Sequence, residues 1–185
     1  MAGDASAAGV ENAPAGPATV AVWDPVVRLF HWTVVAGCLL NLFVLEDRPH
    51  EVVGYIVAAA LTIRVVWGFI GTRYARFADF VPGPRRLTAY LAALVRGREP
   101  RTLGHNPAGA VMMLLLMGLL AAVSLTGWMM SLDAFWGEDW LEELHEGIAN
   151  AILVLALLHA GAALFESWRH RENLVWSMVT GRKRA

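Results

Sequence analysis

Four long apolar stretches alternate with short charged segments along most of the chain. A helix needs about 20 mostly apolar residues to cross the hydrocarbon core of a bilayer. The stretches at about residues 29–46, 50–71, 106–132 and 144–166 come close to that length. The pattern therefore predicts an all-α integral membrane protein, folded as a four-helix bundle.

The first 22 residues contain no such stretch. They consist mainly of Ala, Gly and Pro with scattered acids, and they lack the basic start and apolar run of a secretory signal. This composition predicts a disordered N-terminal tail over residues 1–22. A single membrane domain with a basic C-terminal tail is expected over residues 23–185.

Charged residues divide the connections between spans into two kinds. The basic ones, after the second and fourth stretches, hold Arg73, Arg76, Arg85, Arg86, Arg96, Arg98 and Arg101, and then Arg169, Arg171, Arg182, Lys183 and Arg184. The two opposite connections are mainly acidic. Since Lys and Arg accumulate in cytoplasmic loops, both termini are expected in the cytoplasm. Within the first basic connection, residues 85–95 are expected to form an interfacial helix with Leu87, Tyr90, Leu91 and Leu94 on one face.

Four histidines lie at two depths in the predicted spans. His31 is near the inner start of the first span, and His50 begins the second span at its outer side. His145 begins the fourth span at its outer side, and His159 follows fourteen residues later. Fourteen helical residues rise about 21 Å and return to within about 40° of the same direction. Depth therefore pairs His31 with His159 and His50 with His145, as two sites stacked across the membrane.

These paired histidines suit an iron porphyrin. One histidine in a span can serve an interhelical hydrogen bond, but four that pair by depth indicate binding. A structural zinc site needs four ligands, which neither level supplies, whereas haem takes only axial ligands from the protein. The lone cysteine, Cys38, excludes a Cys-x-x-Cys-His attachment sequence and is expected to be a core residue. The predicted cofactors are therefore two non-covalent b-type haems, each with two histidine ligands, which favours electron transfer.

Five further polar residues have candidate roles. Arg64 lies fourteen residues after His50, at the expected inner level, and we expect it to pair with a haem propionate there. The alternative is that Arg64 extends to the inner headgroups. Glu51 and Glu146 are interpreted as solvated or quinone-site residues; His105 is expected to cap or pack, and His170 to be solvated.

Several motifs after residue 22 have a recognisable pattern. They are Val-Arg-Leu-Phe-His-Trp at 27–32, His50 with Gly54, Arg64-Val-Val-Trp-Gly, Gly104-His-Asn-Pro-Ala-Gly-Ala, Thr126-Gly, His145-Glu, His159 and Met178-Val-Thr-Gly-Arg-Lys-Arg. In these motifs the chain resembles the bacterial cytochrome b561 family, the small four-helix relatives of hydrogenase b-type cytochrome subunits. The resemblance implies two haems b ligated by His31, His50, His145 and His159.

The resemblance also implies a function and a location. The expected protein is a bacterial inner-membrane electron carrier of a respiratory chain, exchanging electrons between the quinone pool and an unidentified redox protein, in effect a quinone oxidoreductase. Membrane lipid is an expected partner and nucleic acid is not, while the sequence leaves a homodimer open. Two alternatives stay open: a haem-bearing anchor subunit of a hydrogenase-like or dehydrogenase complex, and a transporter of metal ions or protons.

Overall fold

The computed structural model describes residues 18–185. Most of the predicted N-terminal tail, residues 1–17, lies outside the described residues. The last part of that predicted tail is ordered, because Thr19–Ala21 forms a short strand, β1, and Val22 is buried. The boundary of the folded domain therefore lies a few residues earlier than its composition suggested.

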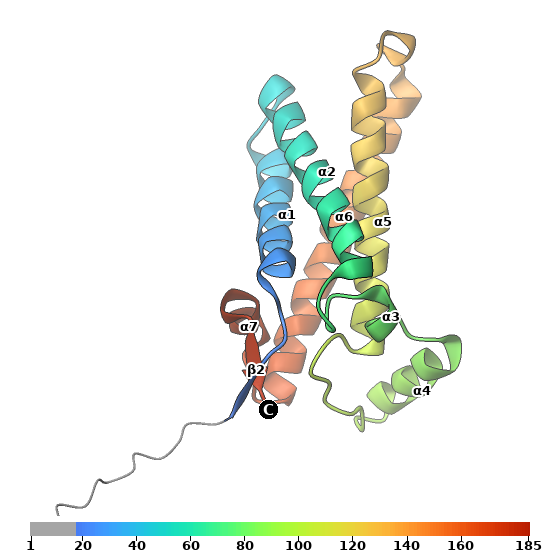
Figure 1. Ribbon diagram of the computed structural model, residues 1–185. Helices are drawn as coiled ribbons and strands as arrows, with labels where there is room; N and C mark the ends of the chain where they lie inside the picture. The colour runs from blue at the N-terminus through green and yellow to red at the C-terminus, as the bar shows by residue number, and fades with distance from the viewer. Residues whose placement is uncertain (1–17) are drawn as a thin grey trace, which may run out of the picture.

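Four long helices form the body of the protein (Figure 1): α1 (Pro25–Phe43), α2 (Asp47–Ile70), α5 (Pro107–Met130) and α6 (Asp139–Arg169). All four are long and apolar enough to cross a membrane, which confirms the four predicted spans. Helix α1 lies a few residues earlier than predicted, and α6 extends beyond its predicted span at both ends. The difference arises because helical turns with polar residues extend beyond the apolar stretches. Helix α1, for example, is capped by Asp24 and has Pro25 in its first turn.

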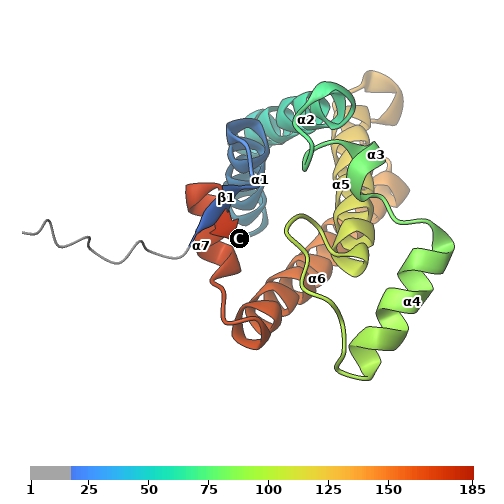
Figure 2. The same cartoon turned by 60° about the horizontal axis from the view of Figure 1, so that its bottom comes forward.

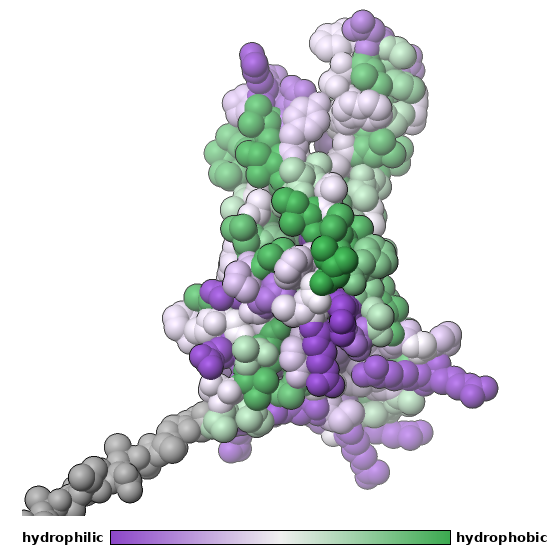
Figure 3. Space-filling model, in the orientation of Figure 1, coloured by the Kyte–Doolittle hydropathy of each residue, from purple (hydrophilic) through white to green (hydrophobic). Residues whose placement is uncertain are grey.

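The outer surface of the bundle is apolar. Only 6% to 22% of the residues in the spanning windows are buried, so most of their apolar side chains face outward. Leu39, Phe69 and Leu157 are each more than half exposed. In Figure 3 the hydrophobic atoms cover the long helices, and hydrophilic atoms gather at one end, near β1 and α4. A surface of this kind is stable against hydrocarbon rather than water.

Packing connects the long helices in sequence around an interior. Helix α1 packs on α2, α2 on α5, and α5 on α6, and Figure 2 shows the helices arranged around a central space in the ribbon. The core cluster lies between α2, α5 and α6 and consists of Val57, Leu61, Met117, Leu120 and Ile152. Helices α1 and α6 are therefore connected through α2 and α5, with little direct packing between them.

Short elements gather at one end of the bundle. They are α3 (Phe77–Phe80), α4 (Pro84–Val95), α7 (Leu174–Thr180), β1 and β2 (Arg182–Arg184), while the 3-10 helix η1 (Asp133–Phe135) lies in the connection between α5 and α6. Strands β1 and β2 pair antiparallel, with Val20 opposite Lys183. This pair is an addition to the predicted all-α fold, and it arises because an even number of long helices returns the two flanking segments to one end.

The structure confirms a helix in the first basic connection, α4, over Pro84–Val95. Its Tyr90 is buried, whereas Leu91, expected on the same face, is 42% exposed. The amphipathic pattern therefore located the helix correctly and overstated the width of its packed face.

Asp24 connects the start of α1 to the end of α2. Its Oδ1 accepts a hydrogen bond from the backbone N–H of Val27 at 3.0 Å. Its Oδ2 accepts from Trp67 Nε1 at 3.0 Å and from Thr72 Oγ1 at 2.6 Å. Burial alone would raise the pKa of Asp24, but these hydrogen bonds hold it below its ordinary value of 3.8. The carboxylate therefore stabilises the fold above that value, and the contribution is lost as the pH falls through the folded pKa.

A second contact holds α7 against α1. Arg28 donates to the carbonyl of Val179, and Trp32 Nε1 donates to the carbonyl of Met178 at 3.2 Å. Helix α7 ends at Gly181, which has a φ of 78° and whose position leaves no room for a side chain beside the carbonyl of Trp23. A glycine is required there because the left-handed conformation and the close backbone approach both exclude a Cβ.

Replacing Asp24 with Ala should lower the free energy of unfolding by about 1–2 kcal/mol, because one cap and two interhelical hydrogen bonds are lost. The thermal midpoint of the purified protein in detergent measures this. The matched control is Asp79→Ala, which removes an exposed i,i+3 ion pair with Arg76 and should cost about 0.5 kcal/mol or less. Equal losses in the two variants would contradict the connecting role of Asp24.

Candidate functional site

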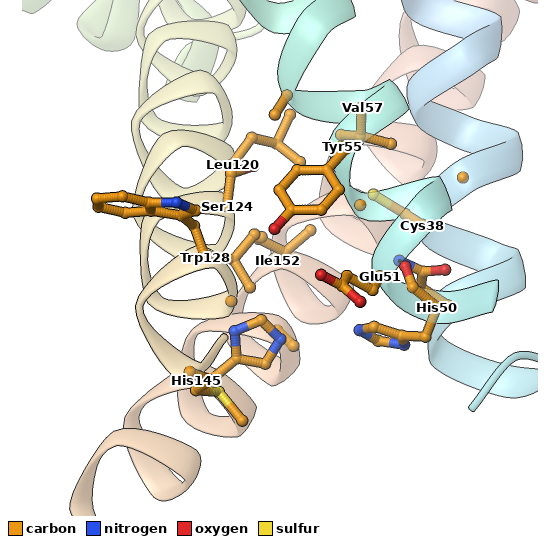
Figure 4. Close-up of a pocket in the computed structure, with 18 of the residues that line it drawn as sticks. Cys38, His50, Glu51, Tyr55, Val57, Leu120, Ser124, Trp128, His145 and Ile152 are labelled. Carbon is orange, nitrogen blue, oxygen red and sulfur yellow. Dashed lines mark hydrogen bonds between the residues drawn. The ribbon is translucent and has the colours of Figure 1, made fainter. Parts of the chain in front are cut away.

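A cavity of about 590 Å³ opens between the four long helices near their acidic ends. Its walls combine apolar side chains such as Val57, Leu120 and Ile152 with the imidazoles of His50 and His145. Figure 4 shows the two histidines on opposite walls, His50 on α2 and His145 on α6. An apolar cavity with a few convergent polar groups is the usual form of a cofactor site.

The two imidazoles have the spacing that one shared metal requires. Their ring centroids are 6.1 Å apart, with an interplanar angle of 57°. A metal–imidazole bond is about 2 Å long, so two rings bound to opposite sides of one ion stand about 6 Å apart. The predicted pairing of His50 with His145 is therefore compatible with the geometry.

Thr126 contacts one ring nitrogen of His145. Its Oγ1 lies 2.9 Å from His145 Nδ1 and 3.1 Å from the carbonyls of Ala122 and Val123. When the hydroxyl donates to one of these carbonyls, its oxygen accepts from Nδ1–H. This tautomer leaves a lone pair on Nε2 for a ligand, the usual arrangement of a metal-binding histidine.

Gly127 provides room for the same ring. A Cβ at this position would lie 3.1 Å from His145 Cε1, closer than ordinary van der Waals contact. The Thr126-Gly pair therefore both orients and accommodates His145. Glu51 also lines the cavity, but its side chain is exposed, as is that of Glu146. Exposure is compatible with the solvated role expected for both carboxylates.

The second predicted histidine pair is His31 on α1 with His159 on α6, and both side chains are half-buried. The ring of His31 stands edge-on to Trp32, with centroids 5.0 Å apart, and its Nδ1 is buried without a hydrogen-bond partner. Fourteen residues along α6 separate His159 from His145, which is about 21 Å along the axis. The two pairs therefore lie at different depths of the bundle.

Arg64 is enclosed by the protein and does not reach out to headgroups. It is 1% exposed and donates from Nη2 to the carbonyl of Ala75 at 3.2 Å. Its guanidinium stands 5.4 Å from the centre of the Phe77 ring, and Nη1 is buried without a partner. The alternative that Arg64 extends to the membrane surface is therefore wrong. An unpaired donor on a buried cation is costly unless an anionic group accepts from it.

His105 lies beside this arginine. Its ring packs against Trp23 and Phe80, at centroid distances of 4.8 and 4.7 Å. The predicted packing role is confirmed, whereas the cap of α5 is the neighbouring Asn106, which accepts from the N–H of Gly109. Burial lowers the pKa of His105 to about 3, with further lowering by the charges of Arg64, His159 and Lys183. His105 is therefore neutral at physiological pH, close to both Arg64 and His159.

One expectation for the basic tail is wrong. His170 was expected to be solvated, but its side chain is 19% exposed and its Nε2 lies 3.0 Å from Glu166 Oε2. The reason is that α6 continues to Arg169, which places His170 one turn after Glu166 on the same face. The orienting role of Thr126 is a second feature that residue spacing alone did not reveal.

Comparison with known proteins agrees with the residue pattern. A model of the family described as prokaryotic cytochrome b561 matches residues 22–181. The chain belongs to the prokaryotic cytochrome b561 family. Membership confirms the resemblance noted in the sequence and implies haem b as a cofactor of this cytochrome b561 protein.

Curated relatives of this family member match along most of its length. A probable Ni/Fe-hydrogenase B-type cytochrome subunit of Rhizobium leguminosarum bv. viciae is 23% identical, over 89% of this chain and 89% of the relative. A protein of the same description from Rhodobacter capsulatus is 24% identical, over 89% of this chain and 81% of the relative. The counterpart from Bradyrhizobium diazoefficiens is 24% identical, over 91% and 87%. No solved structure matches significantly.

Replacing Thr126 with Val should weaken haem binding by about 10- to 100-fold, because His145, a predicted haem ligand, loses its orienting acceptor. Release of haem to a scavenging apoprotein measures the change. Thr62→Val is the matched control, since Thr62 also bonds the carbonyl four residues earlier but is exposed. If the Thr126→Val variant releases haem at the same rate as the natural protein, the orienting role of Thr126 is contradicted.

Proposed function

We propose that this protein holds two b-type haems, one between His50 and His145 and one between His31 and His159, and carries electrons across the membrane. The observation that carries the proposal is the 6.1 Å spacing of the His50 and His145 rings across the cavity. The haem-iron sites would be stacked along α6, which supplies one ligand to each. An iron porphyrin with both axial positions filled supplies one-electron transfer.

The groups that surround each pair support this assignment. The outer cavity is large enough for a macrocycle and mostly apolar, so its walls exclude water and keep the cofactor in place without a covalent bond. At the inner pair, the unpartnered Nδ1 of His31 and Nη1 of Arg64 are buried polar atoms that remain costly without a ligand. Arg64 would form an ion pair with an anionic propionate of the inner haem.

Charge favours one orientation in the membrane. The end that carries α4, α7 and the β1–β2 pair also holds most of the arginines, and by the positive-inside rule it faces the cytoplasm of a bacterial inner membrane. Both described ends of the chain would then be cytoplasmic. The outer haem would lie near the opposite face, where electrons exchange with quinone or with a redox protein.

A more specific role follows from the relatives. The curated proteins described as Ni/Fe-hydrogenase B-type cytochrome subunits cover nearly the whole chain, which favours a hydrogenase-like protein as the redox partner. In that case the protein is the membrane anchor that connects a catalytic subunit to the quinone pool. Purifying the protein from its native membranes in mild detergent and measuring the nickel content per haem tests the anchor role. Nickel that co-purifies in a fixed ratio supports that role. Absence of nickel favours a carrier without a bound catalytic subunit.

Transport of protons or metal ions is the weaker alternative. A cation path through a membrane usually needs acidic groups near the middle. Among residues 18–185, the buried polar or charged side chains within the four long helices are Arg64 and Thr126, and neither is acidic. The interior therefore offers a site for an anionic group rather than a path for cations.

Substituting single histidines tests the pairing. We expect two haems per chain by extraction and a bis-histidine absorption spectrum in the natural protein. His50→Ala and His145→Ala should each remove the same haem, and His31→Ala and His159→Ala the other, because a haem that has lost one of two ligands binds weakly. His170→Ala is the control, since its ring lies beyond the end of α6, outside both pairs, and should leave both haems bound. Loss of haem that does not follow these pairs would refute the assignment.

Replacing Arg64 with Leu should lower the reduction potential of the inner haem. The buried positive charge stabilises the reduced form, and this stabilisation is lost with the charge. A spectroscopic redox titration resolves the two haems, and the outer haem serves as the internal reference. Arg64→Lys keeps the charge and should restore most of the potential. Identical titrations for the natural protein and Arg64→Leu would refute the pairing with a propionate.

A further inference from the structure

Three metal-ligating side chains converge at the basic end of the bundle, away from the histidine pairs. Glu99 belongs to the connection between α4 and α5, while Glu166 and His170 lie one turn apart at the end of α6. One ligand atom from each of the three lies within 4.8 Å of the others. Folding therefore places Glu99, which is distant in the sequence, beside the last turn of α6.

The ligand atoms in this cluster are buried and incompletely paired. The side chain of Glu99 has no exposed surface, and although it forms an ion pair with Arg169, its Oε2 has no hydrogen-bond partner. His170 Nε2 is also buried, and although it lies 3.0 Å from Glu166 Oε2 it makes no hydrogen bond of acceptable geometry. A buried carboxylate oxygen and a buried imidazole nitrogen without partners are costly unless a cation binds between them.

The neighbouring charges compensate the two carboxylates only in part. Glu99 pairs with Arg169, whereas Glu166 lies 3.0 Å from His170. Lys183 Nζ donates to the carbonyl of Thr102 at 3.1 Å and lies 3.9 Å from Glu172, and its charge acts on Glu166 less than on Glu172. Tyr90 lies 3.5 Å from Glu166, but burial and the charges of Glu166 and Glu99 raise its pKa to about 12, so it stays neutral.

We propose that Glu99, Glu166 and His170 form a binding site for a divalent transition-metal ion of the zinc class. One imidazole nitrogen and two carboxylate oxygens are ligands that Zn²⁺ binds at about 2.0–2.2 Å, with water in a fourth position. Such an ion links the connection after α4 to the end of α6. The site is distinct from the haem ligands, because Glu166 follows His159 by two helical turns, about 10 Å along the axis.

Zinc binding to the purified haem protein tests the site. After chelator treatment, equilibrium dialysis should find one Zn²⁺ per chain that is lost or weakened at least about 10-fold in Glu99→Gln, Glu166→Gln and His170→Asn. The matched control is Glu172→Gln, which removes a nearby carboxylate paired with Arg101 and should leave zinc affinity unchanged. Variants are compared only when their haem spectra and gel-filtration volumes equal those of the natural protein.

A second variant separates a metal site from a structural ion pair. Arg169→Gln removes the cation that pairs with Glu99, so Zn²⁺ should bind at least as tightly as in the natural protein. The proposal is overturned by the absence of zinc binding in the natural protein, by full affinity in the three ligand variants, or by loss of affinity in Arg169→Gln. None of these results bears on the haem pairing, which is measured separately.

Discussion

The hydrocarbon of a bilayer offers no hydrogen-bond partners, and this constraint organises the whole protein. Backbone groups in the spans must bond within their own helices, and apolar side chains must face outward. Polar side chains inside the spans are then stable only toward the interior, where something must accept or bind them. Arg64 is accordingly almost completely buried, and His50 and His145 face one another across a largely apolar cavity.

Helix α6 has a central position in this arrangement because it carries His145 and His159 fourteen residues apart. In the proposed assignment each of these histidines takes a partner from a different helix, His50 from α2 and His31 from α1. The interior must therefore stay wide between α6 and the α1–α2 pair, and the packing observed does this by connecting them through α5. The hydrogen bonds of Asp24, and those of Arg28 and Trp32 to α7, hold the helices together at the end that carries α7. The cavity near the other end remains open enough for a large cofactor.

Local signals account for most of the correct predictions. Apolar length located the four spans, and the third predicted stretch begins within one residue of the start of α5. The amphipathic pattern located α4. Helix ends were displaced because polar turns, which carry no apolar signal, continue α6 to Arg169. The β1–β2 pair was not predicted, since two three-residue strands become stable only when the helices bring them together.

The sequence by itself determined the four apolar helices, the places of the four histidines along them and the family, because apolar length, spacing and motifs are local properties that need no contacts to be recognised. The tertiary structure decided which atoms meet. Only packing brings Thr126 to His145 Nδ1, encloses Arg64 beside Phe77, and places Glu99 beside Glu166 and His170. These contacts join residues from different elements, or they depend on how one side chain is oriented against another. Spacing along the chain predicts neither the contact between elements nor the orientation of a side chain.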